Sequence, residues 1–231
     1  MFVKCQPIIK RVISQDKVVA IILLHTKGFT VKLPSAKPVI KKPPEDDPYF
    51  HVCGLDISLS NLGMAKFRYY LTDGYLEACD ARLVTTQAEP KKSKVRKNSD
   101  DLNRCRSLIQ GLEEFTLDCR FLFIELPVGS QSARAMASYG ACCGIAASIK
   151  KPLILVMPLE VKAVTGKNLA SKDAMIAWGV KLFPDIPWLK ERGKKDGHLV
   201  KANEHIADAC AAVKAGVLTE PFLNAVAYAK G

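Results

Sequence analysis

The pattern of hydrophobic and polar positions predicts three strands in the first part of the main domain. Residues 50–57 are apolar on both faces apart from His51 and Asp56, which is typical of a central strand. Residues 63–71 and 75–84 are rich in aromatic and β-branched side chains and flank an Asp-Gly pair at 73–74, a strong hairpin signal. We therefore expect three consecutive strands in an antiparallel meander.

Further along the chain, the pattern alternates between helices and buried strands. Ser99 or Asp100 is expected to cap an amphipathic helix whose apolar positions run from Leu102 to Phe115. The elements expected after it are a strand at 121–126, an alanine- and glycine-rich helix at 133–149, a strand at 153–157, a helix at 170–183 and a helix at 204–217. This order, β-β-β-α-β-α-β-α, predicts an α/β fold with a mixed five-stranded sheet flanked by helices, as in the ribonuclease H-like fold.

The N-terminal region differs from the rest in composition. It is basic, and the proline-rich stretch 41–44 followed by acidic residues marks its end. Residues 17–24 and 29–33 are expected to form either a small β hairpin or part of a flexible arm. We therefore divide the chain into a basic N-terminal appendage at 1–48 and a main domain at 49–231.

Composition indicates a globular protein with a polyanionic partner. Hydrophobic residues make up 48% and charged residues 25% of the chain, which excludes a wholly disordered or fibrous protein. The net charge of +11 favours nucleic acid first and a membrane surface second. The apolar run at 18–24 is too short to span a bilayer, and its basic and polar flanks do not resemble a secretion signal.

The cysteines indicate a reducing environment. The eight of them contain no Cys-x-x-Cys pair and are too sparse for a disulfide scaffold. We expect them to be small core residues of a cytoplasmic protein, although the basic N-terminus leaves an organellar address open.

Two carboxylates, Asp56 and Glu125, interrupt otherwise apolar strands that are neighbours in the expected sheet. Buried charges need partners, and the last helix adds His205 and Asp208 one turn apart on a single face. Clustered carboxylates repel one another unless cations bind between them, and oxygen-rich clusters suit Mg²⁺ or Mn²⁺. Two such ions can activate water and stabilise the leaving oxygen of a phosphodiester, so the pattern predicts a nuclease.

These residues also have other interpretations. Asp56 alone could bond nearby backbone amides, and Glu125 could cap the following helix. His205 is a metal ligand, a proton relay or an ordinary helix residue, and Glu204 is expected to be a solvated neighbour. The basic run at 91–97 is either a solvated loop or a phosphate contact.

Four short motifs, spread over roughly residues 50–217, resemble the RuvC family of Holliday-junction resolvases. They are Gly54-Leu55-Asp56-Ile57-Ser58, Ile124-Glu125-Leu126-Pro127, Val161-Lys162-Ala163-Val164-Thr165-Gly166 with Ala170-Ser171-Lys172, and Ala207-Asp208-Ala209 with His205 one turn earlier. The resemblance implies that Asp56, Glu125 and Asp208 bind metal. His205 falls where many members have a further Asp.

The resemblance also implies a Mg²⁺-dependent crossover junction endodeoxyribonuclease, with Mn²⁺ able to substitute and two ions per site. Such an enzyme is a homodimer that resolves four-way DNA junctions by paired symmetric nicks, with Lys162 and Lys172 near the scissile phosphate. The helix at 133–149, with Gly140 and Gly144, corresponds to the dimerisation helix, although on sequence alone this composition favours tight packing over a dimer face. The appendage and the basic run are additions to the common core.

Two other functions remain open. One is a catalytically inactive protein of the same fold that binds branched DNA. The other is an actin-like or sugar-kinase-type ATPase, because residues 54–63 also resemble a phosphate-binding hairpin of that class. The chain after residue 150 contains no second glycine-rich phosphate loop, which argues against the ATPase.

Overall fold

The computed structural model describes residues 12–14, 17–19, 43–44, 46–90, 96–126, 132–166, 171–191, 193 and 197–230. The chain divides into two compact units, residues 1–42 and 43–231. In the first unit, β1 (Val12–Ser14) pairs with β2 (Lys17–Val19) as antiparallel strands. The expected hairpin between 17–24 and 29–33 depends on residues 20–33, which lie outside the described residues.

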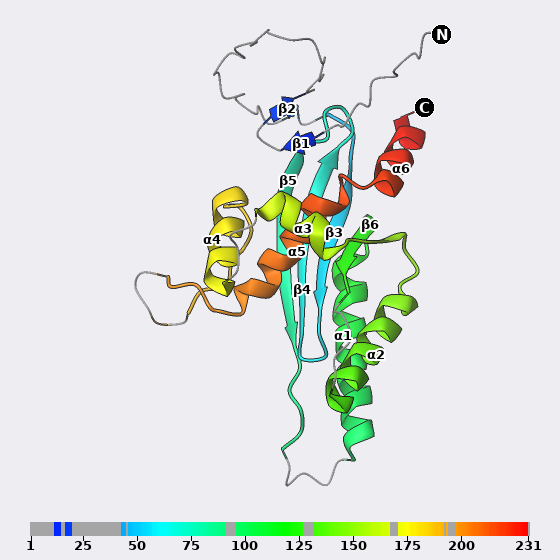
Figure 1. Cartoon of the computed structure of the whole chain (residues 1–231), viewed down its shortest axis with the longest axis vertical. Helices are drawn as coiled ribbons and strands as arrows, with labels where there is room; N and C mark the ends of the chain where they lie inside the picture. Colours follow the sequence, from blue (N-terminus) through cyan, green and yellow to red (C-terminus); the bar gives the residue numbers. More distant parts are fainter. Residues whose placement is uncertain are drawn as a thin grey trace, which may run out of the picture. The chain divides into compact units, whose positions relative to one another are not determined.

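The second unit is built on a five-stranded mixed sheet with the strand order β5-β4-β3-β6-β7 (Figure 1). The strands are β3 (Tyr49–Ile57), β4 (Asn61–Tyr70), β5 (Leu76–Thr85), β6 (Cys119–Glu125) and β7 (Leu153–Leu155). The first three form the antiparallel meander, and β6 and β7 continue the sheet parallel to β3. This arrangement confirms the α/β, ribonuclease H-like fold class expected from the element order.

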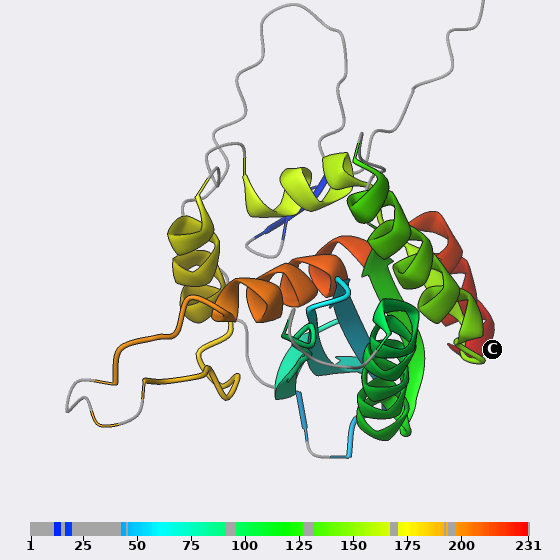
Figure 2. The same ribbon diagram turned by 90° about the horizontal axis from the view of Figure 1, so that it is seen from below.

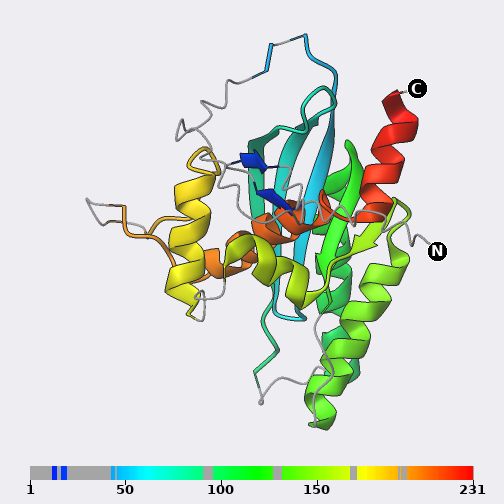
Figure 3. The same ribbon diagram turned by 45° about the horizontal axis from the view of Figure 1, so that its top comes forward.

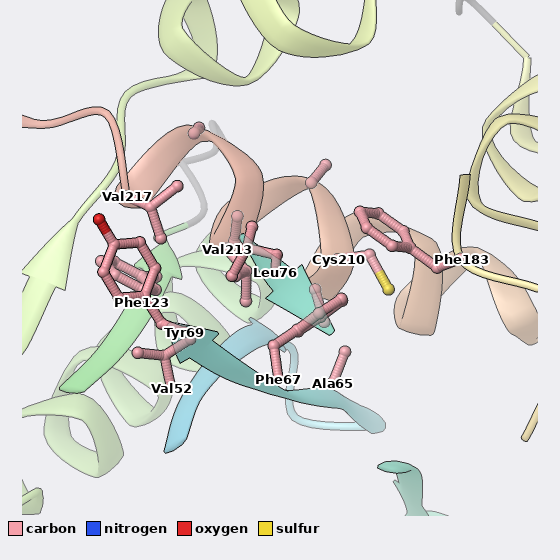
Figure 4. Close-up of a cluster of buried hydrophobic side chains, with 14 of the residues drawn as sticks. Val52, Ala65, Phe67, Tyr69, Leu76, Phe123, Phe183, Cys210, Val213 and Val217 are labelled. Carbon is pink, nitrogen blue, oxygen red and sulfur yellow. The ribbon is translucent and has the colours of Figure 1, made fainter. Parts of the chain in front are cut away.

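Helices cover both faces of this sheet (Figure 2). They are α1 (Lys97–Thr116), α2 (Ala133–Ser148), α3 (Pro158–Thr165), α4 (Lys172–Leu182), α5 (Asn203–Gly216) and α6 (Glu220–Lys230). One hydrophobic cluster lies between the sheet and α5 (Figure 4). A second cluster lies between the opposite face and α1 and α2. The sheet is therefore buried on both sides, as its apolar central strands require.

The remaining helices pack around α5 and β6. α3 and α4 contact α5, and α6 lies beside β6 (Figure 3). Phe222 of α6 packs edge-on against Phe121 and Phe123. The hydropathy pattern does not predict α3 or α6, because α3 is short and only Phe222 and Val226 of α6 are buried.

The expected cap of α1 is wrong. The helix begins one turn earlier, after Arg96, with no side-chain cap, and Ser99 and Asp100 lie inside its first turns. The Asp100 carboxylate is instead buried and accepts a hydrogen bond from the Glu89 backbone N–H at 3.4 Å. Because this carboxylate binds a neighbouring segment, it is not available to cap the N-terminus of the helix.

The inward face of α1 also differs from the apolar pattern. Leu102 is 50% exposed, whereas Arg104 is buried. The Arg104 guanidinium donates hydrogen bonds to the Thr86 hydroxyl, the Leu59 carbonyl and the Ser60 hydroxyl. A buried, hydrogen-bonded arginine therefore ties α1 to the β3–β4 turn, at a position where the pattern favours an apolar residue.

The described cysteines are free thiols, and Cys53, Cys119, Cys142 and Cys210 are buried in the core. This is the structural role expected for them. Within the parts of the chain that the structure describes, no helix combines the length and apolar character needed to cross a bilayer.

Candidate functional site

The two strand carboxylates lie side by side at the carboxyl ends of adjacent strands. Asp56 of β3 and Glu125 of β6 are direct neighbours across the parallel pair. Alternate residues of each strand, such as Val52 and Phe123, pack in the cluster under α5. Since side chains alternate between the two faces of a sheet, Asp56 and Glu125 lie on the α5 side as well.

Two glycines let α5 lie directly on the sheet at this point. A Cβ on Gly54 would overlap the Ala209 carbonyl oxygen, and one on Gly63 would overlap the His205 carbonyl oxygen. Gly63 is also the cross-strand neighbour of Asp56. The absence of two side chains therefore allows the first turns of α5 to approach the strand end that carries Asp56.

His205 is bonded directly to Asp56. Its Nδ1 lies 2.6 Å from Asp56 Oδ2, and its Nε2 lies 3.6 Å from Glu204 Oε1. The hydrogen bond with Asp56 raises the pKa of His205, burial opposes this shift, and the charges of Asp56, Glu204 and Asp208 add to it. The carboxylates around His205 therefore stabilise its imidazolium form relative to a free histidine.

The other two carboxyl groups, Asp208 and Glu125, lie where ionisation is disfavoured. Burial, followed by the charge of Asp56, raises the pKa of Asp208 from 3.8 to about 7, and His205 opposes the shift. Burial, again followed by Asp56, raises the pKa of Glu125, while Lys162 lowers it. Such a site favours any group that brings positive charge, including protons and metal ions.

Glu204 is not the solvated neighbour that the sequence predicts. Its side chain is 14% exposed, and its Oε1 lies 2.6 Å from the ammonium of Lys172. α4 packs against α5 here, and Lys172 is the first residue of α4. The helical pattern of α5 alone contains no information about this contact.

The two lysines lie at the margin of the carboxylates. Lys162, on α3, is near enough to Glu125 to lower its pKa. Lys172 bonds Glu204, and the charges of Asp208 and Asp56 also raise its pKa. The structure thus brings together all six residues selected from the sequence. The loop at 127–131 and the basic residues 91–95 lie outside the described residues.

The donor types fit a hard divalent cation, but the present arrangement is not a formed metal site. Across the described residues, no group of three or more His, Cys, Asp and Glu side chains is placed to hold a metal ion. Asp56, Glu125 and Asp208 nevertheless offer the oxygen ligands that Mg²⁺ prefers, and the raised pKa values of Glu125 and Asp208 show charge that a cation would neutralise. Asp56 is engaged with His205 instead.

The glycines of α2 do not pack within the chain. Among the described residues, a Cβ on Gly140 or Gly144 would meet no atom within 4 Å. The explanation of these glycines by tight internal packing is therefore wrong. The exposed residues of this helix include Ala133, Met136, Ala137, Gly140, Gly144 and Ala147.

No protein-family model matches the chain, and no curated protein matches it. Solved structures do resemble it, including the three that follow. Thermus thermophilus RuvC is 18% identical over 77% of this chain and 96% of that chain, with a TM-score of 0.46. T. thermophilus RuvC in complex with a Holliday junction substrate is 15% identical over 72% of this chain and 91% of that chain, with a TM-score of 0.46. Fowlpox virus resolvase in complex with Holliday junction DNA is 14% identical over 77% of this chain and 97% of that chain, with a TM-score of 0.41. Membership of the RuvC family stays a prediction.

Proposed function

We propose that this chain is a metal-dependent endonuclease that cuts four-way DNA junctions. The observation that carries the proposal is the cluster of Asp56, Glu125 and Asp208, in which two of the carboxyl groups have raised pKa values. The chain around this acidic cluster has a net charge of +11, which attracts a polyanion. An acidic site in a basic protein suits hydrolysis of a nucleic-acid backbone.

Asp56, Glu125 and Asp208 would hold Mg²⁺ or Mn²⁺. Two bound ions would supply Lewis-acid chemistry, activating a water and stabilising the leaving oxygen. His205 contributes a proton site, since its Nδ1 is engaged with Asp56 and its Nε2 is the nitrogen left to exchange a proton. His205 acts as a metal ligand only through Nε2, or after it releases Asp56. Lys162 and Lys172 supply positive charge for the phosphate.

We infer that two copies of the chain present two such sites to one junction. The support is the outward face of α2, where Gly140 and Gly144 leave open space and Met136 is 43% exposed. Small residues on a helix allow the backbones of two helices to approach closely. A homodimer through α2 would make paired, symmetric nicks possible.

The test is incubation of the purified protein with an end-labelled four-way junction, a fork and a linear duplex, each with Mg²⁺, Mn²⁺ or EDTA. We expect paired, metal-dependent incisions in the junction. Asp56→Asn should abolish them while junction binding persists, because it removes a ligand without removing positive charge. Asp80→Asn, on the distant edge strand β5, is the matched control and should cut normally.

The second candidate is an inactive protein that binds branched DNA, and the hydrogen bond that engages Asp56 with His205 favours it. Tight junction binding without incision under every metal would establish this alternative. Normal cutting by Asp56→Asn, or indifference to all three DNAs, would refute the nuclease.

A further inference from the structure

Glu204 connects two residues of the site through a single oxygen. Its Oε1 lies 2.6 Å from Lys172 Nζ and 3.6 Å from His205 Nε2. The opposite nitrogen of that imidazole bonds Asp56. Four side chains from β3, α4 and α5 therefore form one continuous charged row that ends at the protein surface.

The two ends of the Lys172–Glu204 pair have different access to solvent. The Lys172 side chain is 76% exposed, whereas Glu204 is 14% exposed. A ligand from solvent can therefore reach the ammonium while Glu204 stays fixed. Exposed ion pairs of this kind contribute little to folding stability, and a phosphate oxygen is a strong alternative partner for lysine.

The ammonium also lies within the field of the carboxylate cluster. The hydrogen bond and charge of Glu204 raise the pKa of Lys172, and the charges of Asp208 and Asp56 add to the effect. An unpaired lysine on the surface would sample many rotamers. Glu204 restricts the Lys172 side chain to the edge of the carboxylate cluster, where the scissile phosphate would bind.

We propose that Glu204 is a positioning residue that holds Lys172 at the site in the free protein. When DNA binds, Lys172 leaves Glu204 and pairs with a backbone phosphate of the bound strand. This inference rests on the proposed function. Two opposite effects follow. Glu204 competes with DNA for the lysine and so weakens binding, but it also places the lysine correctly and so increases the cleavage rate at saturating DNA.

Glu204→Gln separates these effects, because it keeps the shape of the side chain and removes its charge. We expect junction binding in EDTA at low salt to tighten by about threefold to tenfold. We expect the cleavage rate at saturating junction to fall. In a Lys172→Ala background, Glu204→Gln should no longer change the affinity. Asp173→Asn, which removes the same charge from the residue next to Lys172, is the matched control and should tighten binding less.

The Lys172 ammonium signal in ¹H–¹⁵N spectra reports on the pair without any activity. It should shift when Glu204→Gln is introduced and again when junction DNA is added. Equal tightening with and without Lys172, or an ammonium signal insensitive to Glu204→Gln, would overturn the positioning role alone. Failure to bind any DNA would overturn the proposed function itself. If Glu204→Gln does not fold, Lys172→Gln gives the same comparison from the other partner, with weaker binding expected.

Discussion

Asp208→Asn should make the metal-free protein more stable above pH 7. Burial and the charge of Asp56 raise the pKa of Asp208 from 3.8 to about 7. A carboxyl group whose pKa is higher in the folded state opposes folding when it ionises. Its penalty is absent below pH 3.8, grows as the pH rises, and is complete above pH 7.

The magnitude follows from the size of this shift. The difference between 3.8 and about 7 corresponds to about 4 kcal/mol of folding free energy. After burial, the shift includes the charges of Asp56, Glu125 and Glu204, so part of the penalty depends on the protonation of these neighbours. We expect Asp208→Asn to raise the free energy of unfolding by about 2 to 4 kcal/mol at pH 8. At pH 4, the free energy of unfolding of this variant should differ little from that of the unchanged protein.

Urea unfolding in EDTA at several pH values between 4 and 8 measures this difference. Asp101→Asn provides a contrast of opposite sign, because the hydrogen bond from Arg134 lowers the pKa of Asp101 and its ionised form stabilises the fold. That variant should lose stability at pH 8. A stability curve for Asp208→Asn that runs parallel to the unchanged protein across this range would refute the electrostatic reasoning.

Three further changes test other parts of the structure. Gly63→Ala should displace α5, weaken the His205–Asp56 bond and cost about 1 to 3 kcal/mol in thermal unfolding, and an unchanged midpoint would contradict the close packing. Gly140→Lys should leave the fold intact but give a monomer in sedimentation. A variant that still sediments as a dimer would show that α2 is not the dimer face. Removing residues 1–42 should leave a cooperatively unfolding core, and an insoluble product would contradict the division into two units.

The fold is predictable from sequence because its central strands are clear runs of apolar and β-branched residues. β3, β4 and β5 combine apolar and branched residues with an Asp-Gly turn, and their observed bounds differ from the expected ones by one or two residues. The pairing of Asp56 with Glu125 also follows from sequence, since both interrupt apolar strands that the element order makes adjacent.

Interactions between elements distant in the chain are less visible in the sequence. The pairing of Glu204 depends on α4 packing against α5, and the burial of Arg104 depends on carbonyl and hydroxyl groups of the β3–β4 turn and the end of β5. No periodicity within one helix encodes these partners. The open space at Gly140 is likewise a property of the whole surface rather than of α2.

The position of α5 in the chain determines when the cluster forms during synthesis. The hydrogen bond between Asp56 and His205 joins residues that are 149 positions apart. At a translation rate of about 5 to 20 residues per second, roughly 7 to 30 s separate the synthesis of these two residues. During that interval, the strand carrying Asp56 exists without the helix that completes the cluster. A ribosome-bound chain therefore has no assembled cluster until α5 has been synthesised and can pack on the sheet.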